Sequence, residues 1–272
     1  MVAETSSAGA ERGVSLQTLL AHPQARLLVG LAAVLLFLIA WQIVGAGEIV
    51  RSDLISYPTE IIRTFFSMAA SGELTTNAAV SLQEFVQGFV PAVLVGVAIG
   101  TGFALSRRLR AMFEPLVIAL NTSPIIAFVP IVVVWFGVGL QSKSVMVFLA
   151  SVIPVIINTT TGIGEVNEAW IRACRAFGAR RRQVVMKAIL PGALPSLMAG
   201  IRLSVGRAVV ALIAAEMYVS VRGIGRLIQV YSTSDRAAEI FVLVAIVSSF
   251  GFLLVTLLRR VEDWLAPWKR DS

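Results

Sequence analysis

The stretch LLVGLAAVLLFLIAWQIVGAG, Leu27–Gly47, contains no charged residue. It is long enough to cross the hydrocarbon layer of a membrane as a helix, which takes about 20 residues. The rest of the chain has the same character, because 57% of its 272 residues are apolar and only 14% are charged. Soluble globular domains carry about 25% charged residues. The sequence therefore predicts an all-α, polytopic membrane protein.

Five more apolar runs of this kind follow along the chain. Four are free of charge, whereas the run before Ser220 carries Arg202, Arg207 and Glu216 but is otherwise apolar. We therefore expect six transmembrane helices. The predicted spans are Leu27–Gly47, Phe85–Ser106, Pro115–Ser142, Ser144–Gly164, about Leu197–Ser220 and Ile240–Leu258.

The basic residues predict the orientation of these spans. If the N-terminus is cytoplasmic, most of the 23 Lys and Arg residues lie in cytoplasmic segments, as the positive-inside rule requires. Both termini are then cytoplasmic. Since these residues are spread over several loops, no basic domain is available for nucleic acid, and the partner is the lipid bilayer. The single Cys and single His exclude a disulfide within the chain and most metal and imidazole chemistry, so we expect no catalytic residue, metal or cofactor.

Three segments flank or connect the spans. Residues 1–26 form a polar leader, which we expect to be cytoplasmic and disordered to about Leu16. The leader is long and poorly basic for a signal peptide, which favours an uncleaved first span, although Gly45–Gly47 leaves cleavage open. Residues 58–71 have the spacing of a short amphipathic helix on the outer face. Residues 265–272 form a cytoplasmic tail.

The cytoplasmic loop 165–196 is far longer than a connection between two spans requires. We expect its first helix to run from Glu168 to Phe177, with Trp170, Cys174 and Phe177 on one face and Gly178 as the C-terminal cap. A second, basic segment should end at Pro191, before the next span. Such a loop is typical of a docking surface for a soluble partner, with an interfacial helix held by anionic lipid as the alternative.

Two spans contain residues that could line a pathway. Pro124 and Pro130 interrupt the third span, which should therefore face the interior of the bundle, with pathway lining and simple packing both open for these prolines and Ser123. Arg207 and Glu216 are too far apart on one helix to pair with each other. Arg207 could meet an anionic substrate or close a structural network, and we take the structural role as the working hypothesis. Glu216 is expected to belong to a packing network.

The loop resembles the coupling loop of ABC importer permeases. That pattern reads Glu-Ala-Ala, three residues, Gly, nine residues, then Ile-x-Leu-Pro, and the matching residues here are Ala173, Gly178, Leu190 and Pro191. Three positions depart from the pattern: Arg172 stands where the family has Glu, Cys174 stands at the second Ala, and Ala188 stands at the Ile. Any ion pair that this Glu makes elsewhere is absent or reversed in this chain.

The resemblance extends over roughly Tyr57 to Trp264. Within the family, the chain is similar to the nitrate, sulfonate and taurine branch. It includes NTSPIIAFVPIVVVWFGVG at Asn121–Gly139 and the pair Ala215-Glu216-Met217 and Gly223-Ile-Gly225. The resemblance implies a transmembrane permease domain over residues 27–264 in a bacterial cytoplasmic membrane. It also implies a type I importer bundle that moves a small, anionic solute inward.

The family also implies partners. The chain has no Gly-x-x-x-x-Gly-Lys-Ser/Thr loop, so ATP hydrolysis must come from cytoplasmic ABC ATPase subunits. A second permease copy and an extracytoplasmic solute-binding protein would complete the importer. The residues expected to couple to the ATPase are Trp170, Arg172, Ala173, Cys174, Phe177, Gly178, Leu190 and Pro191, and those expected along the pathway are Ser123, Pro124, Pro130, Arg207 and Glu216.

Two other functions compete with this one. An ion- or proton-coupled secondary carrier could use Arg207 and Glu216, but it predicts internal repeats, and the two halves show no convincing repeat. An intramembrane enzyme needs a nucleophile and a base at membrane depth, where the chain has neither His nor Asp. The sequence does not identify the substrate.

Overall fold

The computed structural model describes residues 23–47 and 55–267, and the polar leader up to Leu16 lies outside them. In these residues all regular structure is helical. The chain divides into two compact units, Met1–Glu60 and Ile61–Ser272, and each is described by itself. The fold class expected from the sequence, an all-α polytopic membrane protein, is confirmed.

The described part of the first unit consists mainly of α2, Pro23–Ala46. From Leu27 onward nearly all of its side chains are exposed, as expected for a helix whose solvent is lipid. Trp41 Nε1 donates to the carbonyl of Ser56 at 2.8 Å, and Gln42 Oε1 accepts from the backbone N–H of Thr59 at 3.2 Å. These bonds connect the end of α2 to the start of α3, Pro58–Ala70.

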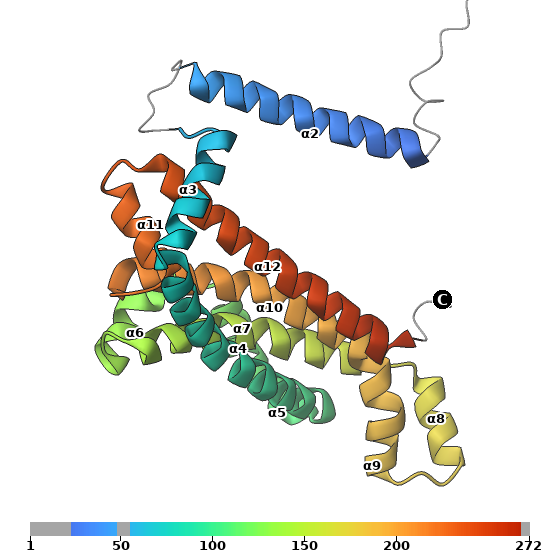
Figure 1. Cartoon of the computed structure of the whole chain (residues 1–272). Coiled ribbons are helices and arrows are strands. Elements are labelled where there is room, and N and C mark those ends of the chain that lie inside the picture. The colour runs from blue at the N-terminus through green and yellow to red at the C-terminus, as the bar shows by residue number, and fades with distance from the viewer. Residues whose placement is uncertain (1–22, 48–54, 268–272) are drawn as a thin grey trace, which may run out of the picture. The chain divides into compact units, whose positions relative to one another are not determined.

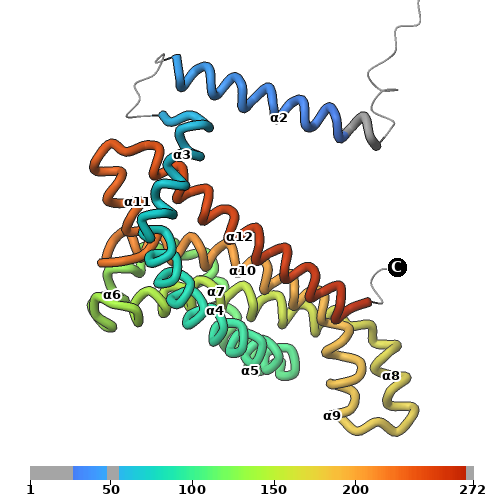
Figure 2. Tube along the Cα trace, viewed as in Figure 1, coloured from blue at the N-terminus to red at the C-terminus, as the bar shows by residue number. Residues whose placement is uncertain are grey.

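The second unit is a bundle of long helices, shown in Figures 1 and 2. Its four long members are α4 (Glu73–Leu105), α7 (Leu140–Gly164), α10 (Leu190–Val219) and α12 (Ala237–Leu265). Each is long and apolar enough to cross a membrane, as is α2. Figure 2 shows α7 and α10 running side by side, with α12 packed along α10.

Small residues allow α4 to approach α7 closely. A side chain placed at Gly88, Gly96 or Gly100 would collide with Val147, Val155 or Thr159 of α7, so these positions admit only glycine without a shift of the helices. Ala92, on the same face of α4, is fully buried. Membrane helices have no hydrophobic effect to join them, and close packing of this kind stabilises their contact instead.

The third predicted span is not one helix. It consists of α5 (Arg107–Thr122), a 3₁₀ turn at Ile125–Phe128, and α6 (Val129–Phe136), and the two parts meet at 97°. Ser123 is extended, as a residue before a proline prefers, and Pro124 separates the helices. Pro130 lies in the first turn of α6, where a proline is tolerated. Counting the bent pair as one span gives six in the described residues.

Part of this span packs into the bundle of the single chain, because Val129 and Val132 of α6 are buried, whereas α5 lies at its surface. No residue of α5 is buried, and Pro124 and Pro130 are both exposed. The freed carbonyl groups at the break therefore lie at the surface of the chain, where a cavity or a second protein can contact them.

The prediction that the second loop helix ends at Pro191 is also wrong. The helical segment runs on from α9 (Arg181–Val184) through a π-helical turn (Val185–Ile189) into α10. Because the N–H of Leu190 bonds to the carbonyl of Val185, five residues back, the backbone is widened directly before Pro191. The proline, which has no N–H to donate, is accommodated in the first turn that follows.

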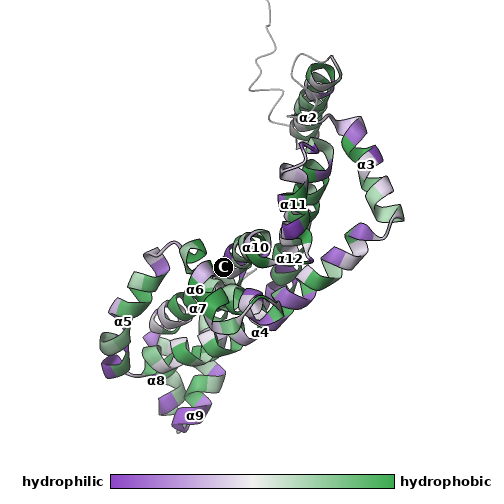
Figure 3. Cartoon of the chain, turned by 90° about the vertical axis from the view of Figure 1, so that its left-hand side faces the viewer, coloured by the Kyte–Doolittle hydropathy of each residue, from purple (hydrophilic) through white to green (hydrophobic). Residues whose placement is uncertain are grey.

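Two short helices complete the unit. The helix α8, Glu168–Ala176, lies beside α9, and Figure 1 shows the pair projecting away from the bundle. Figure 3 shows that α9 is hydrophilic, in contrast to the spans. The helix α11, Ile224–Ser232, was not predicted; its apolar face packs with α3 on a cluster formed by Met68, Leu74, Ile224, Tyr231, Val242 and Leu243.

Candidate functional site

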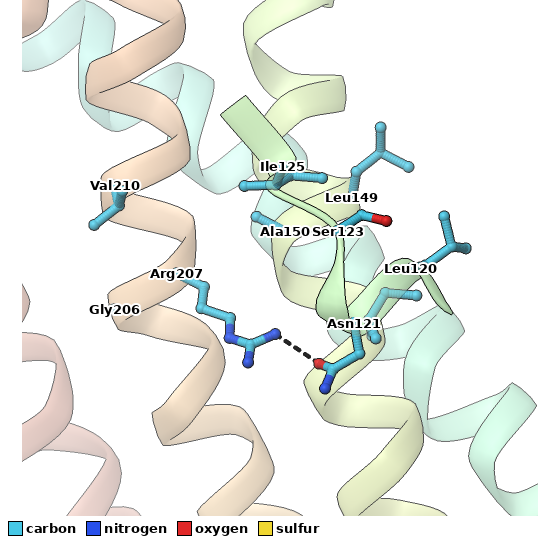
Figure 4. Close-up of a pocket in the computed structure, with 10 residues that line it drawn as sticks. Leu120, Asn121, Ser123, Ile125, Leu149, Ala150, Gly206, Arg207 and Val210 are labelled. Atoms are coloured by element: carbon cyan, nitrogen blue, oxygen red, sulfur yellow. Dashed lines mark hydrogen bonds between the residues drawn. The ribbon is translucent and has the colours of Figure 1, made fainter. Parts of the chain in front are cut away.

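A cavity of about 290 Å³ lies beside α10, between α7 and the end of α5. Figure 4 shows the side chain of Arg207 reaching from α10 toward Asn121 of α5. Arg207 Nη1 donates to Asn121 Oδ1 at 2.7 Å. The lining residues are Leu120, Asn121, Ser123, Ile125, Leu149, Ala150, Ile153, Gly206, Arg207 and Val210.

The cavity combines one cation with largely apolar walls. A guanidinium carries five N–H donors in a planar fork, and the bond to Asn121 uses one of them. The side chain of Arg207 is exposed, so its other donors are accessible. A planar fork of donors suits the oxygen atoms of an anion, and apolar walls suit a short carbon chain.

The structure brings together only two of the five expected pathway residues. Arg207 and Ser123 both line the cavity. Pro124 creates the break beside it but does not line it, and Pro130 belongs to the following helix. Glu216 lies at the other end of α10 from the loop 165–196, in separate surroundings.

Glu216 is completely buried and is hydrogen-bonded to two other segments of the chain. Its Oε1 accepts a hydrogen bond from Ser81 Oγ at 2.5 Å, and its Oε2 accepts one from the N–H of Gly225 at 2.6 Å. Ser81 Oγ in turn accepts from the N–H of Ile224 at 2.9 Å. A carboxylate at the first N–H groups of a helix satisfies donors that have no partner within the helix. Glu216 thus anchors the start of α11.

Glycine is required where the chain passes this carboxyl group. Gly223 has a φ of 127°, in the region that favours glycine, and a Cβ at Gly223 or Gly225 would collide with the side chain of Glu216. Asn77 Oδ1 accepts from the N–H of Gly223 at 2.8 Å. The sequence Gly223-Ile-Gly225 is therefore explained by close approach of the backbone to Glu216.

A second hydrogen bond fixes the C-terminal end of α11. Tyr231 Oη donates to Glu73 Oε1 at 2.7 Å, which connects α11 to the first turn of α4. Burial, together with this hydrogen bond, raises the pKa of Tyr231 to about 12. The phenol therefore keeps its proton, and its hydrogen bond, at any physiological pH.

The helix α8 has defined ends. Asn167 Oδ1 caps its N-terminus by accepting from the N–H of Ala169 at 2.8 Å. At its C-terminus Gly178 has a φ of 74°, and the N–H groups of Gly178 and Ala179 bond to the carbonyls of Arg175 and Cys174. This is a Schellman motif, so the predicted glycine cap is confirmed.

The expected coupling residues have three different environments. Phe177 is 91% exposed, whereas Cys174 is half-buried and packs on the apolar cluster beneath α8. Trp170 is 52% exposed and lines a cavity of about 240 Å³ with Lys187, Ala188, Pro191 and Gly192. Trp170, Cys174 and Phe177 thus differ in burial, and Phe177 follows the last residue of α8.

The other expected coupling residues are either exposed or half-buried. Arg172 is exposed and forms an ion pair of 2.8 Å with Glu168, one turn earlier on α8. Ala173 is also exposed, and Leu190 and Pro191 are half-buried at the start of α10. Arg172 thus has a partner within its own helix, although the family pattern has an acidic residue at its position.

Comparison with known proteins identifies the chain. Residues 92–271 match the family described as the inner membrane component of binding-protein-dependent transport systems. The taurine transport system permease protein TauC of Escherichia coli (strain K12) is 31% identical over 90% of this chain and 90% of its own length. The chain belongs to this family. It is the permease component of an ABC transporter and a multi-pass inner membrane protein.

Two further comparisons agree. This permease is 31% identical to the putative aliphatic sulfonates transport permease protein SsuC of Bacillus subtilis (strain 168), over 85% of this chain and 84% of that protein. A solved structure of the MetNI methionine ABC transporter in inward-facing conformations matches with a TM-score of 0.58 and 21% identity, covering 68% of this chain and 92% of the other. That likeness shows a shared fold.

Several residues of the permease site were missed from the sequence. Lys143 falls between the predicted spans Pro115–Ser142 and Ser144–Gly164, yet it is only 5% exposed and forms an ion pair with Glu84 of α4, which is 1% exposed. Both lie at the edge of charge-free runs, where the sequence pattern assigns a charge to a loop. Asn121 was recognised only as part of a motif. In the part of the chain that the structure describes, no group of His, Cys, Asp and Glu could hold a metal ion.

Proposed function

We propose that this permease carries a small organic anion, of the taurine or alkylsulfonate class, through the cavity that contains Arg207. The observation that carries the proposal is the exposed guanidinium of Arg207, held by Asn121 at 2.7 Å in a cavity with mostly apolar walls. The similar proteins named for taurine and sulfonate transport support the same substrate class.

The cavity offers a physical reason for this choice. An isolated arginine at mid-membrane costs at least about 2.5 kcal/mol on insertion scales, so it requires a partner or a wet cavity. Asn121 is an uncharged partner, and it orients the fork without neutralising it. A passing anion supplies the missing charge, and the apolar lining tolerates its carbon chain. The arginine therefore lowers the barrier for an anion and raises it for a cation.

The energy for transport is proposed to come from cytoplasmic ABC ATPase subunits that dock on α8 and α9. Phe177 projects into solvent at the end of α8, and Trp170 borders an open cavity at the start of α10. Large aromatic side chains of this kind are typical anchors of protein interfaces. Because α9 continues into α10, which carries Arg207, a displacement of the loop reaches the cavity along one helical segment.

The remaining parts of the importer follow from this arrangement. A second permease copy is proposed to cover the exposed faces of α5 and α6, so that the cavity lies between two copies. A solute-binding protein delivers the anion from outside. In this topology residues 27–264 form the permease domain, the segment 58–71 lies on the outer face, and the loop 165–196, the leader 1–26 and the tail 265–272 are cytoplasmic.

The test is ATP-driven uptake of radiolabelled taurine, and separately of an alkylsulfonate, into proteoliposomes that contain the complete importer. Arg207→Gln should reduce uptake by tenfold or more, while the complex keeps its melting temperature and basal ATPase activity. Arg207→Lys should restore part of the uptake, because the charge is retained. Arg108→Gln, which removes an arginine outside the cavity, is the matched control. Loss of melting temperature or of assembly in Arg207→Gln would instead support the structural role of this residue.

A further inference from the structure

The helices α4, α7 and α10 enclose a cluster of three buried charged groups. Glu84 and Lys143 form an ion pair. Ser81, one turn before Glu84 on α4, donates to Glu216, and Lys143 also donates to Ser220, one turn after Glu216, so the two carboxyl groups lie in the same cluster. Glu84 is 1% exposed, Glu216 0% and Lys143 5%. We call Glu84, Lys143 and Glu216 the ionic cluster. It contains two acidic groups and one basic group.

One acceptor atom in the ionic cluster has no hydrogen-bond donor. Lys143 Nζ donates to Ser220 Oγ at 2.8 Å as well as to Glu84, and both oxygen atoms of Glu216 have donors in Ser81 and Gly225. Glu84 Oε2, in contrast, is buried and has no hydrogen-bond partner in the part of the chain that the structure describes. Two ionised carboxylates cannot bond to each other, because neither has a hydrogen to donate.

We propose that Glu84 and Glu216 hold one proton between them and form a carboxylic acid–carboxylate pair inside the membrane domain. This proton gives Glu84 Oε2 the donor that it lacks. It also reduces the net charge of the ionic cluster from −1 to zero, which removes the cost of an uncompensated charge in a medium of low dielectric constant. The ligand is a resident proton, so the proposal does not require proton-driven transport and does not depend on the proposed substrate.

The groups around the pair favour this assignment. Lys143 of α7 is the cation that pairs with Glu84, while α11 contributes the N–H of Gly225 to Glu216 and the N–H of Ile224 to Ser81 Oγ. The loop between α10 and α11 contributes the hydroxyl group of Ser220, which also bonds to the carbonyl of Arg222. The proton therefore completes a network that holds this loop against α4 and α7.

Infrared spectroscopy of the purified full-length protein, in a detergent that contains no ester or carboxyl group, tests the proposal. A protonated carboxyl group has a carbonyl-stretching band that a carboxylate lacks. At pH 7 exposed acidic groups do not contribute to this band, because their pKa is about 4. We expect the band in the parent protein at pH 7 and expect Glu84→Gln and Glu216→Gln each to abolish it, since each change removes one of the two carboxyl groups that share the proton.

The matched control is Glu262→Gln. Glu262 is also a buried glutamate on a membrane helix, at 4% exposure, but it pairs with Arg202 and belongs to a different site. This variant should keep the band. A parent protein without the band, or a band that survives both Glu84→Gln and Glu216→Gln, would overturn the proposal.

A second measurement needs no variant. The folded state holds one more proton than the unfolded state at neutral pH, so the melting temperature should fall as the pH rises and the pair is deprotonated. The loss of the band and the fall of the melting temperature should therefore follow the same titration curve. A band that disappears over a pH range in which the melting temperature does not change would contradict the role of the proton in the network.

Discussion

The two ends of α10 differ in the burial of the residue that characterises each: Glu216 at the C-terminal end, and Phe177 in the loop at the N-terminal end. At its C-terminal end Glu216 is 0% exposed, and both of its oxygen atoms accept hydrogen bonds. At its N-terminal end, beyond the π-helical turn, the loop 165–196 presents Phe177 at 91% exposure. The carboxyl group at the first end thus has its hydrogen-bond partners within the chain. The second leaves large apolar side chains uncovered, which is typical of a surface that another protein covers.

Because of this difference, we expect variants at one end to affect the stability of the permease and variants at the other end to affect its function. Variants at the Glu216 end should damage the folded permease, because they strand buried groups. Variants on the loop should leave the permease intact and weaken its contact with the ATPase. The predictions below test that separation, starting with the largest expected effect.

Glu216→Ala should be the most damaging of these changes. It leaves the hydroxyl of Ser81 and the N–H of Gly225 buried without an acceptor, and each such group costs about 1–3 kcal/mol. Thermal unfolding of the purified protein should show a large fall in melting temperature. Glu114→Ala removes an exposed carboxylate from an ion pair with Arg110 and should change the melting temperature little. Equal effects of the two substitutions would show that the Glu216 network is not the source of stability.

Phe177→Ala should weaken binding of the ATPase by at least about tenfold, as loss of an interface anchor worth about 2 kcal/mol requires. The melting temperature of the permease alone should not change, since the side chain makes little contact within the chain. Binding can be measured by biolayer interferometry with the immobilised permease. The matched control is Phe252→Ala on α12, which removes a phenylalanine of 75% exposure from a membrane span. If both variants bind like the parent, Phe177 is not an anchor.

Gly178→Val should produce a smaller loss of binding. Its φ of 74° costs a residue with a Cβ about 1–2 kcal/mol, although no atom lies within 4 Å of the added carbon. The strain should weaken the hydrogen bonds of the Schellman motif, so that Phe177 is held less firmly. Gly164→Val, at a glycine that also has free space but lies within α7, is the control. Hydrogen exchange at Ala179 should increase only in the first variant, and unchanged protection there would contradict the effect of strain.

Arg172→Ala should have the smallest effect. Its ion pair with Glu168 is exposed, and pairs of this kind contribute about 0.3–0.5 kcal/mol. ATPase binding and ATP-driven uptake should therefore stay within about twofold of the parent. A loss as large as that of Phe177→Ala would instead assign a direct contact to this position, where the family pattern has Glu.

The sequence predicted the helices well but not their breaks and bends. Apolar runs located the spans that are single helices, because the membrane imposes a length of about 20 residues. The 97° bend at Ser123 depends on how α6 packs beside α7, which the spacing of Pro124 alone does not specify. Pro191 suggested a helix end, whereas a π-helical turn accommodates it. Local proline rules cannot anticipate either arrangement.

Only part of the site was predicted, because a sequence shows which residues need a partner but not which residues provide one. Arg207 stood out as a charge within an apolar run, and Gly178 as a cap after an amphipathic helix. The partners of Arg207 and Glu216 come from helices far away in the sequence, namely Asn121 of α5 and Ser81 of α4. One sequence identifies the group that needs a partner, but the fold decides which residue provides it.

Site-directed cross-linking tests most directly whether the loop 165–196 is the surface that docks the ATPase. Cys174→Ala gives a protein without cysteine, into which a single cysteine is placed either at Phe177 or at Tyr218, which is 71% exposed near the opposite end of α10. A short photoactivatable reagent on position 177 should cross-link the permease to the ATPase subunit, and the same reagent on position 218 should not. Cross-linking from position 218 alone, or from neither position in a complex that hydrolyses ATP, would contradict the account.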